Sequence, residues 1–338
     1  MYRLLLGCLS LLGLAAVTWA ADPITDVTQA GPDYLVQGEY LALGESVAVR
    51  AAQIMALGEG RFRLSLLNGG LPGQGWDGEA PVRLDGTWDE RVVRFAGPNN
   101  AALTWSEGVI TGTDDQGQPV DLSRIKRVSP TMDRQAPEGA IILFDGTGTD
   151  HWANGRMDDD GLLPALSGPL SREAWADFEL HLEFRNPFMP TGRGAARSNS
   201  GIYLQRRYEL QICDSFGDFD AGPGSGNVCG ELYRSVAPLT NACLPPLTWQ
   251  TYDIIFHGAR YSEDGQTKIS PARLTARLNG VLIHDNIVVP DKTGAGQPEG
   301  AQPLPLYLQD HGSPIHFRHV WLKPLAPLPL PAEEAAAP

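Results

Sequence analysis

Short segments with the pattern of β-strands, separated by turns rich in glycine and proline, recur from about residue 46 to residue 323. The chain contains 38 glycines and 27 prolines, and almost no segment shows the spacing of apolar residues that is typical of a helix. Residues 61–66 (Arg-Phe-Arg-Leu-Ser-Leu) alternate polar and apolar side chains, as in a strand with one face in water. The sequence therefore predicts an all-β protein.

The first group of predicted strands lies within residues 21–132. These strands are short, which predicts a small antiparallel β roll or barrel. They are expected at 46–57, 61–67, 91–96, 101–105, 109–113 and 120–128. The loop 68–78 contains five glycines and Trp76. Such a tryptophan can contact a ligand, but it more commonly holds a long loop against the core of its own domain.

A linker with Pro130, Pro137 and Gly139 precedes a second group of longer strands, within residues 138–325. They are expected at 140–144, 178–184, 200–204, 208–214, 250–256, 272–278, 281–289, 304–309 and 315–323. Strands in this number and spacing predict a two-layered β-sandwich. Asn279-Gly280 is the strongest hairpin signal, because a type I′ turn needs positive φ at both positions. Residues 326–338 lack apolar content and predict a disordered tail.

The first 20 residues have the pattern of a secretory signal peptide. Arg3 is followed by the apolar stretch 4–17 and by Thr18-Trp19-Ala20, a small-x-small cleavage site. A membrane anchor is an alternative, but the apolar run is shorter than the roughly 18 to 20 residues that a spanning helix needs. Lipidation at Cys8 is another, but too few apolar residues precede Cys8. We expect a periplasmic or secreted protein with no membrane span after signal removal.

Several functional classes lack their signatures in this chain. The formal net charge of −14 repels nucleic acids and anionic lipids, so neither is an expected partner. The sequence has no G-x-S-x-G elbow, no H-E-x-x-H motif and no glycine loop for phosphates or dinucleotides. It also has no E-x-D-x-E strand, which would supply the paired carboxylates, about 5 Å apart, of an ordinary retaining glycosidase.

Three cysteines remain after signal removal. Cys229 and Cys243 lie in a region rich in glycine, proline and asparagine, and in an oxidising compartment they are the expected disulfide. Cys213 lies in an apolar strand, where we expect it to stay unpaired and buried. A zinc site is the rival interpretation, but the chain has no C-x-x-C motif and no neighbouring histidine pair.

The segment 208–214 predicts a strand with two different faces. Tyr208, Leu210 and Ile212 lie on one face, and Glu209 and Gln211 lie on the other. Because one face of each sheet must fill the core of a sandwich, Glu209 and Gln211 are expected on the outer surface of their sheet, along a groove if the sheet is curved. A carboxylate and an amide side by side suit the hydroxyls of a sugar, although a solvated face without ligand fits the same pattern.

A second polar cluster spans residues 306–321. Asp310-His311 is expected at a strand end, beside a turn, where a histidine can act as general acid, general base or metal ligand. His319 is expected on the same face as Phe317, as a histidine satisfied within the core. Trp249 begins another predicted strand and is a candidate platform for a sugar ring, although such aromatic residues more often belong to the core.

These residues together resemble a known family. The resemblance rests on Asn-Ser-Gly-Ile-Tyr-Leu (199–204), Tyr-Glu-Leu-Gln-Ile (208–212), Asn-Ala (241–242), Trp-Gln-Thr-Tyr-Asp-Ile (249–254) and Leu-Gln-Asp-His-Gly (308–312). In this order they closely resemble the 3-keto-disaccharide hydrolase domain, over about residues 140–325. The resemblance implies a concanavalin-like jelly-roll fold and the cleavage of glycosides already oxidised at carbon 3. The glycine- and aspartate-rich stretch 216–228 departs from the usual pattern and leaves substrate size open.

The implied chemistry needs no pair of carboxylates. A ketone at carbon 3 acidifies the proton on carbon 2, so one base and one group that stabilises the enolate can expel the substituent at carbon 1. The resemblance implies Glu209 or His311 as the base, with Asp310 as a further motif match, and Arg318, Gln211 or a divalent metal ion as the stabilising group. The residues expected to bind the sugar are Gln211, Asn199, Tyr203, Gln309, Trp249 and Arg318. The alternatives are a non-catalytic, lectin-like carbohydrate-binding module, or an adhesion protein in which the first module recognises the partner.

Overall fold

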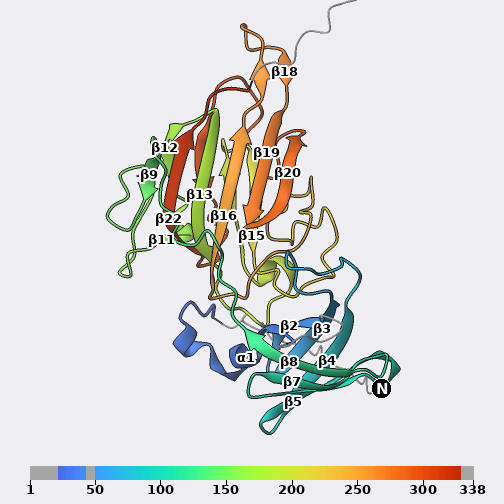
Figure 1. Cartoon of the computed structure of the whole chain (residues 1–338). Coiled ribbons are helices and arrows are strands. Elements are labelled where there is room, and N and C mark those ends of the chain that lie inside the picture. The colour runs from blue at the N-terminus through green and yellow to red at the C-terminus, as the bar shows by residue number, and fades with distance from the viewer. Residues whose placement is uncertain (1–21, 43–49, 329–338) are drawn as a thin grey trace, which may run out of the picture.

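The computed structural model describes residues 22–42 and 50–328. The expected signal peptide and the final part of the expected tail lie outside the described residues. Figure 1 shows two β structures, a barrel built from the N-terminal part of the chain and a larger sandwich built from the rest. The all-β prediction, with a jelly-roll sandwich preceded by a small barrel, is confirmed. Within the described residues, no helix has the length and apolar character needed to cross a membrane.

Eight antiparallel strands close the barrel, because β1 pairs with both β2 and β8. The strands are β1 (Gly38–Leu41), β2 (Arg50–Gly58), β3 (Arg61–Asn68), β4 (Val82–Asp89), β5 (Val92–Ala96), β6 (Ala102–Ser106), β7 (Val109–Thr113) and β8 (Pro119–Ile125). The helix α1 (Gly31–Val36) precedes them, and short 3-10 turns lie at Val27–Gln29 and Pro98–Asn100. Sequence patterning missed β1, which is short, and β4, where Asp85 and Gly86 interrupt the apolar residues.

The second module consists of two packed sheets. The five-stranded sheet has the order β10-β12-β21-β14-β15, and the seven-stranded sheet has the order β11-β22-β13-β16-β19-β20, with β9 also paired to β22. Their bounds are β9 (Ile141–Phe144), β10 (Trp152–Ala153), β11 (Leu163–Pro164), β12 (Leu170–Ala174), β13 (Asp177–Arg185), β14 (Asn199–Leu204), β15 (Tyr208–Cys213), β16 (Trp249–His257), β19 (Ala272–Leu278), β20 (Val281–Val289), β21 (Pro305–Leu308) and β22 (His316–Pro324). A separate hairpin joins β17 (Arg260–Tyr261) to β18 (Lys268–Ser270), and 3-10 turns lie at Ala165–Ser167 and Gly194–Ala196.

Apolar side chains from alternate positions fill the space between the two sheets. Leu210 and Ile212 of β15 and Leu180 and Leu182 of β13 are buried there. The intervening positions point away from this core, which gives the sandwich two outer faces, one on each sheet. The predicted two faces of β15 are therefore confirmed. At the β19–β20 hairpin, Asn279 and Gly280 have φ of 54° and 77°, as a type I′ turn requires.

The loop 214–228 of the sandwich packs against the barrel. Phe219 in this loop packs edge-on against Trp76 of the barrel, with ring centroids 5.3 Å apart. Asp220 forms ion pairs with Arg63 and Arg83 of β3 and β4. Trp76 also packs against a small apolar cluster of its own module. It therefore holds its loop against the barrel, as expected, and in addition contacts the second module.

Candidate active site

The outer face of the five-stranded sheet brings together six of the expected site residues: Asn199 and Tyr203 from β14, Glu209 and Gln211 from β15, and Gln309 and His311 from the segment after β21. β14 and β15 are joined by a tight turn, so Tyr203 lies directly across from Glu209. The Tyr203 hydroxyl donates to Glu209 Oε2 at 2.7 Å, and Gln309 Nε2 donates to the Tyr203 oxygen at 3.5 Å. Residues far apart in the sequence thus form one polar cluster.

Glu209 is nearly enclosed, with 2% of its surface exposed. Burial raises the pKa of the Glu209 carboxyl, and the Tyr203 hydrogen bond and the nearby His311 only partly oppose this effect. Burial and the neighbouring carboxylate also raise the pKa of Tyr203, so its hydroxyl remains a donor. A carboxylate whose pKa is raised toward neutrality can accept a proton from carbon and later return it.

Two glycines pack closely against the Glu209 carboxylate. A β-carbon at Gly201 would lie 2.7 Å from Glu209 Oε1, and a β-carbon at Gly294 would lie 2.8 Å from Oε2. These distances are too short for any side chain. The backbone of each glycine therefore packs directly against the carboxylate, and only glycine fits at these two positions.

Two amide carbonyls next to this carboxylate are buried without a hydrogen-bond partner. They are Oε1 of Gln211 and Oε1 of Gln309. The Gln211 amide is fixed in orientation, since its Nε2 donates to Gly226 O at 2.6 Å and to Asn199 Oδ1 at 3.3 Å. Buried acceptors without partners are uncommon and costly, at about 1–3 kcal/mol each. Both oxygens are suited to accept from hydroxyl groups of a ligand.

The exposed side chain of His311 lies at the rim of the cluster. Its Nδ1 is 3.4 Å from Asn199 Nδ2, which links it through Asn199 to Gln211. Asp310, expected to be catalytic, instead accepts from the backbone N–H of Gly312 at 3.0 Å and shapes the turn that carries His311. Asp310 therefore stabilises the turn that positions His311, and the His311 side chain is exposed to solvent.

Loops cover the strand residues of the cluster, so Glu209 and Gln211, expected along a groove on the outer surface of their sheet, are buried beneath these loops. The Glu209 N–H donates to Thr293 Oγ1 at 2.6 Å, and its carbonyl accepts from the Tyr233 N–H at 2.9 Å. Glu231, fully buried, accepts from the backbone N–H groups of Gly226 and Arg234 at 3.1 and 3.0 Å. Sequence reasoning missed Thr293, Tyr233 and Glu231, because they lie in irregular loops without a repeating pattern.

Two other expected sugar-binding residues lie on the opposite outer face, so they are not part of this cluster. Arg318 belongs to β22 and donates to Glu183 Oε2 of β13 at 2.7 Å. Its guanidinium carbon is 4.3 Å from the centroid of the Trp249 ring. Both side chains extend from the seven-stranded sheet, whose outer face points away from Glu209. Arg318 and Trp249 therefore do not contribute to the cluster around Glu209, and their implied roles in sugar binding stay predictions.

Cys213, Cys229 and Cys243 are all buried and free in the structure, so the disulfide expected between Cys229 and Cys243 in an oxidising compartment stays a prediction. Cys229 Sγ lies 3.4 Å from the Tyr252 hydroxyl, and Cys243 Sγ donates to Leu244 O at 3.4 Å. Burial raises the pKa of Cys243 well above its ordinary value. Each of these two sulfurs lies within hydrogen-bond distance of an oxygen atom in the core. Cys213 is buried, as expected.

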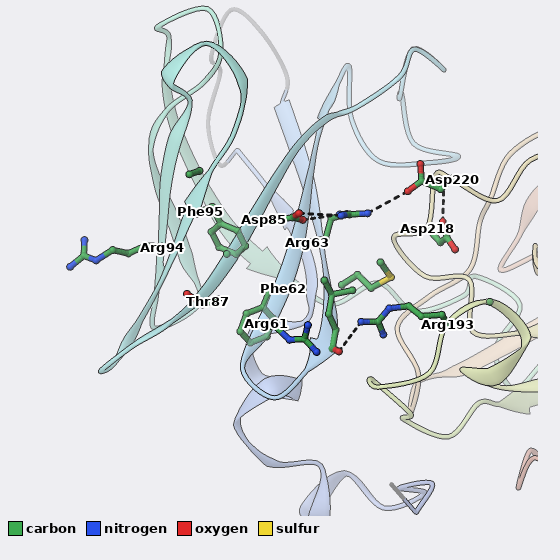
Figure 2. A pocket seen from close by; sticks show the side chains of 15 residues that line it. Arg61, Phe62, Arg63, Asp85, Thr87, Arg94, Phe95, Arg193, Asp218 and Asp220 are labelled. Carbon is green, nitrogen blue, oxygen red and sulfur yellow. Dashed lines mark hydrogen bonds and ion pairs between the residues drawn. The ribbon is translucent and has the colours of Figure 1, made fainter. Parts of the chain in front are cut away.

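A cleft of about 820 Å³ lies between the barrel and the sandwich (Figure 2). Arg61 and Arg63 line it from the barrel, and Arg193, Asp218 and Asp220 line it from the sandwich. Arg63 pairs with Asp85 at 2.8 Å, and Arg193 donates to Leu57 O at 3.0 Å. The cleft is lined by residues other than those around Glu209, so it is a separate feature of the boundary between the modules.

Comparisons with known proteins agree with this arrangement. The family model of the 3-keto-alpha-glucoside-1,2-lyase-like domain matches residues 139–323. A crystal structure from Parabacteroides distasonis, described as "a putative glycosyl hydrolase", is 31% identical, with a TM-score of 0.50, covering 56% of this chain and 85% of that one. A second structure from the same organism, with the same description, is 16% identical, with a TM-score of 0.38, covering 56% of this chain and 95% of that one.

No curated protein matches the chain significantly. The family match covers more than half of the chain, and its range coincides with the strands of the sandwich and with the cluster around Glu209. The resemblance found in the motifs around Glu209 and His311 is thereby confirmed. The chain belongs to the family of 3-keto-alpha-glucoside-1,2-lyase-like domains.

Proposed function

We propose that this protein cleaves glycosides that carry a ketone at carbon 3, by elimination followed by addition of water. The observation that carries the proposal is the buried Glu209, with its raised pKa, beside two buried amide oxygens without partners. A buried base suits removal of a carbon-bound proton, and the free oxygens of Gln211 and Gln309 suit sugar hydroxyls. The family membership of the sandwich supports a carbohydrate as the substrate.

In the first half of the reaction, the Glu209 carboxylate removes the proton from carbon 2, and the electron pair of that bond forms an enolate with the ketone. The enolate then expels the oxygen substituent from carbon 1, so the C1–O bond breaks and a C1=C2 double bond forms. Protonated His311 gives its proton to the departing oxygen. Asn199 and Gln309 each have a second amide N–H available to donate to the enolate oxygen.

In the second half, water adds across the new double bond. Its oxygen bonds to carbon 1 while His311 takes the water proton, and the Glu209 carboxylic acid returns its proton to carbon 2. Both side chains regain their starting protonation states, so no oxidant or reductant is consumed. On this scheme Glu209 is the base, and His311 serves as acid and then as base.

The pattern of the first 20 residues supports export of the protein, and we place it in the periplasm or outside the cell. An exported enzyme of this kind would meet sugars before uptake.

The test uses a chromogenic glucoside and its 3-keto form, each with and without a chelator. We expect release from the 3-keto compound only, and a loss of at least about 100-fold in kcat/KM for Glu209→Gln, as for removal of a general base. Gly201→Ala keeps every charge but crowds the Glu209 carboxylate, so it should also reduce the rate. His311→Ala should lose the acid and base steps and slow both halves.

A matched control is Glu299→Gln. Glu299 accepts from the Tyr208 hydroxyl at 2.5 Å, so it forms a tyrosine–glutamate pair like that of Glu209, but toward the other face of β15. Glu299→Gln should retain activity. If no variant or wild-type protein releases product, while an oligosaccharide still binds, the chain is a lectin-like module and the enzyme proposal fails.

A further inference from the structure

A second group of polar side chains lies on the outer face of the seven-stranded sheet. Asp133, Glu183 and His319 each offer one ligand atom, and these atoms lie within 4.8 Å of one another. His319 Nδ1 is 3.2 Å from Asp133 Oδ1 and 3.3 Å from Glu183 Oε1. Glu183 is fully buried, although it stands on an outer face, because the linker between the modules covers it.

The position of His319 results from an irregularity in β22. Strand β13 pairs His181 with Trp321 but Glu183 with Arg318, so β22 has one extra residue between these pairs. His319 takes up this residue with φ of 44°, a left-handed backbone that is costly for a histidine. The bulge turns His319 out of the core. The expectation of a satisfied core histidine is therefore wrong, and 40% of its side chain is exposed.

A fourth potential ligand atom has no partner. His181 is completely buried, and its Nε2 makes no hydrogen bond. This nitrogen lies 3.8 Å from Glu183 Oε1, beyond hydrogen-bond distance but directed at the same group. Its other nitrogen, Nδ1, is 2.8 Å from Asp253 Oδ1. With the proton on Nδ1, donated to Asp253, the lone pair of Nε2 faces Glu183.

We propose that Asp133, Glu183 and His319, with His181 as the fourth group, bind a divalent transition-metal ion, with zinc as the reference ion. Metal–ligand bonds of about 2.0–2.2 Å in a tetrahedron place neighbouring ligand atoms about 3.3–3.6 Å apart. The two separations that involve His319 match this edge length, and that of His181 requires a small shift of the ring. Two imidazoles and two carboxylates suit zinc and similar ions better than calcium or magnesium, which prefer oxygen ligands.

Groups around the site would orient its ligands. Asp253 holds His181, and Arg318 donates to Glu183 Oε2, while Glu183 Oε1, which accepts one backbone N–H, has a second lone pair for the ion. Such partners of the ligands are common around bound zinc. Asp133 itself is fixed, since its backbone N–H donates to Glu183 Oε1 at 2.6 Å.

The ion would connect the linker to the sandwich. Asp133 belongs to the segment that leads from the barrel, and the other three groups belong to β13 and β22. The site lies on the sheet opposite to Glu209 and does not depend on the proposed reaction.

The test titrates zinc into the full-length protein, freed of metal with a chelator, by calorimetry, with the melting temperature as a second readout. We expect about one zinc per chain, a rise in melting temperature on binding, and at least about tenfold weaker binding for His319→Ala and for Asp133→Ala. Glu183→Gln, which keeps the size of the side chain, should weaken binding likewise.

The control is His311→Ala, which removes the exposed histidine of the other face and should leave zinc binding unchanged. Binding that survives His319→Ala and Asp133→Ala, binding that is lost only in His311→Ala, or no binding by wild type would each overturn the proposal. If Glu183→Gln lowers stability in chelator, the two exposed-ligand variants still decide the result, because their side chains lie at the surface.

Discussion

At the scale of single residues, the environment of Glu209 differs strongly from that of an ordinary surface glutamate. Its carboxylate is covered by loops, touches a tyrosine hydroxyl and is flanked by two glycines. Its neighbour Gln211 has an oxygen without a partner. The unpartnered oxygen of Gln211 costs folding free energy, and a ligand hydroxyl that donates to it would offset that cost.

The raised pKa of Glu209 leads to a prediction for stability. Because the folded protein holds this proton more tightly than the unfolded chain, the contribution of Glu209 to folding is fully present below its unfolded pKa, near 4.5, and is lost as pH rises through its folded pKa. Glu209→Gln removes this loss. We expect the variant to gain stability relative to wild type as pH rises above about 4.5, measured by urea unfolding at a series of pH values.

For Asp264→Asn we expect the opposite change in stability with pH. The Ser262 hydroxyl lowers the pKa of the exposed Asp264, so wild type gains stability from this group above its unfolded pKa. The variant should therefore lose stability relative to wild type as pH rises. A stability difference between Glu209→Gln and wild type that does not change with pH would contradict the buried, proton-retaining state of Glu209.

At the scale of elements, strand patterning predicted most of the long strands and the two faces of β15. The alternation of apolar residues determined which face fills the core, so Glu209 and Gln211 were correctly assigned to the outer face of their sheet. The covering loops could not be predicted, because their contacts join residues 226–233 and 293–296 to β15 without any sequence periodicity. Sequence patterning also did not predict the bulge in β22. Because strict alternation ignores this one extra residue, it predicted that His319 faces the core, whereas His319 lies on the outer face.

The covering loop depends on Glu231, which leads to a prediction at this scale. Glu231→Gln replaces one of two acceptor oxygens with an amide that faces the backbone N–H groups of Gly226 and Arg234. We expect a loss of about 1–3 kcal/mol and faster hydrogen exchange at these two amides, with exchange in the barrel unchanged. The Gln211 amide would lose its fixed partner at Gly226 O, so kcat/KM should also fall. Unchanged protection of Gly226 would show that the loop does not rely on Glu231.

At the scale of the whole molecule, an arginine in a buried ion pair of the sandwich also donates a hydrogen bond to the barrel. Arg197 donates to Asp214 Oδ2 at 2.8 Å and to the barrel carbonyl of Ala56 at 3.0 Å, and its side chain is 2% exposed. Arg197→Met leaves the Asp214 carboxylate buried without its partner. We expect a loss of about 3–5 kcal/mol in the free energy of unfolding of the full chain.

Arg193→Met provides the control for this prediction. Arg193 also donates to a barrel carbonyl, that of Leu57, but it is exposed and lines the cleft of Figure 2. Its loss should cost less than about 1 kcal/mol. Equal effects of the two substitutions would mean that the ion pair with Asp214 contributes little to the junction.

The loop 214–228 gives the barrel an influence on chemistry that takes place outside it. One part of the loop, at Phe219 and Asp220, rests on the barrel, and another part, at Gly226, holds the amide of Gln211. A change in the position of the barrel would be transmitted through this one loop to the Gln211 amide, which accepts from the sugar in the proposed mechanism. On that mechanism, exchange of the barrel for another domain would change which sugars are accepted without altering one residue of the five-stranded sheet.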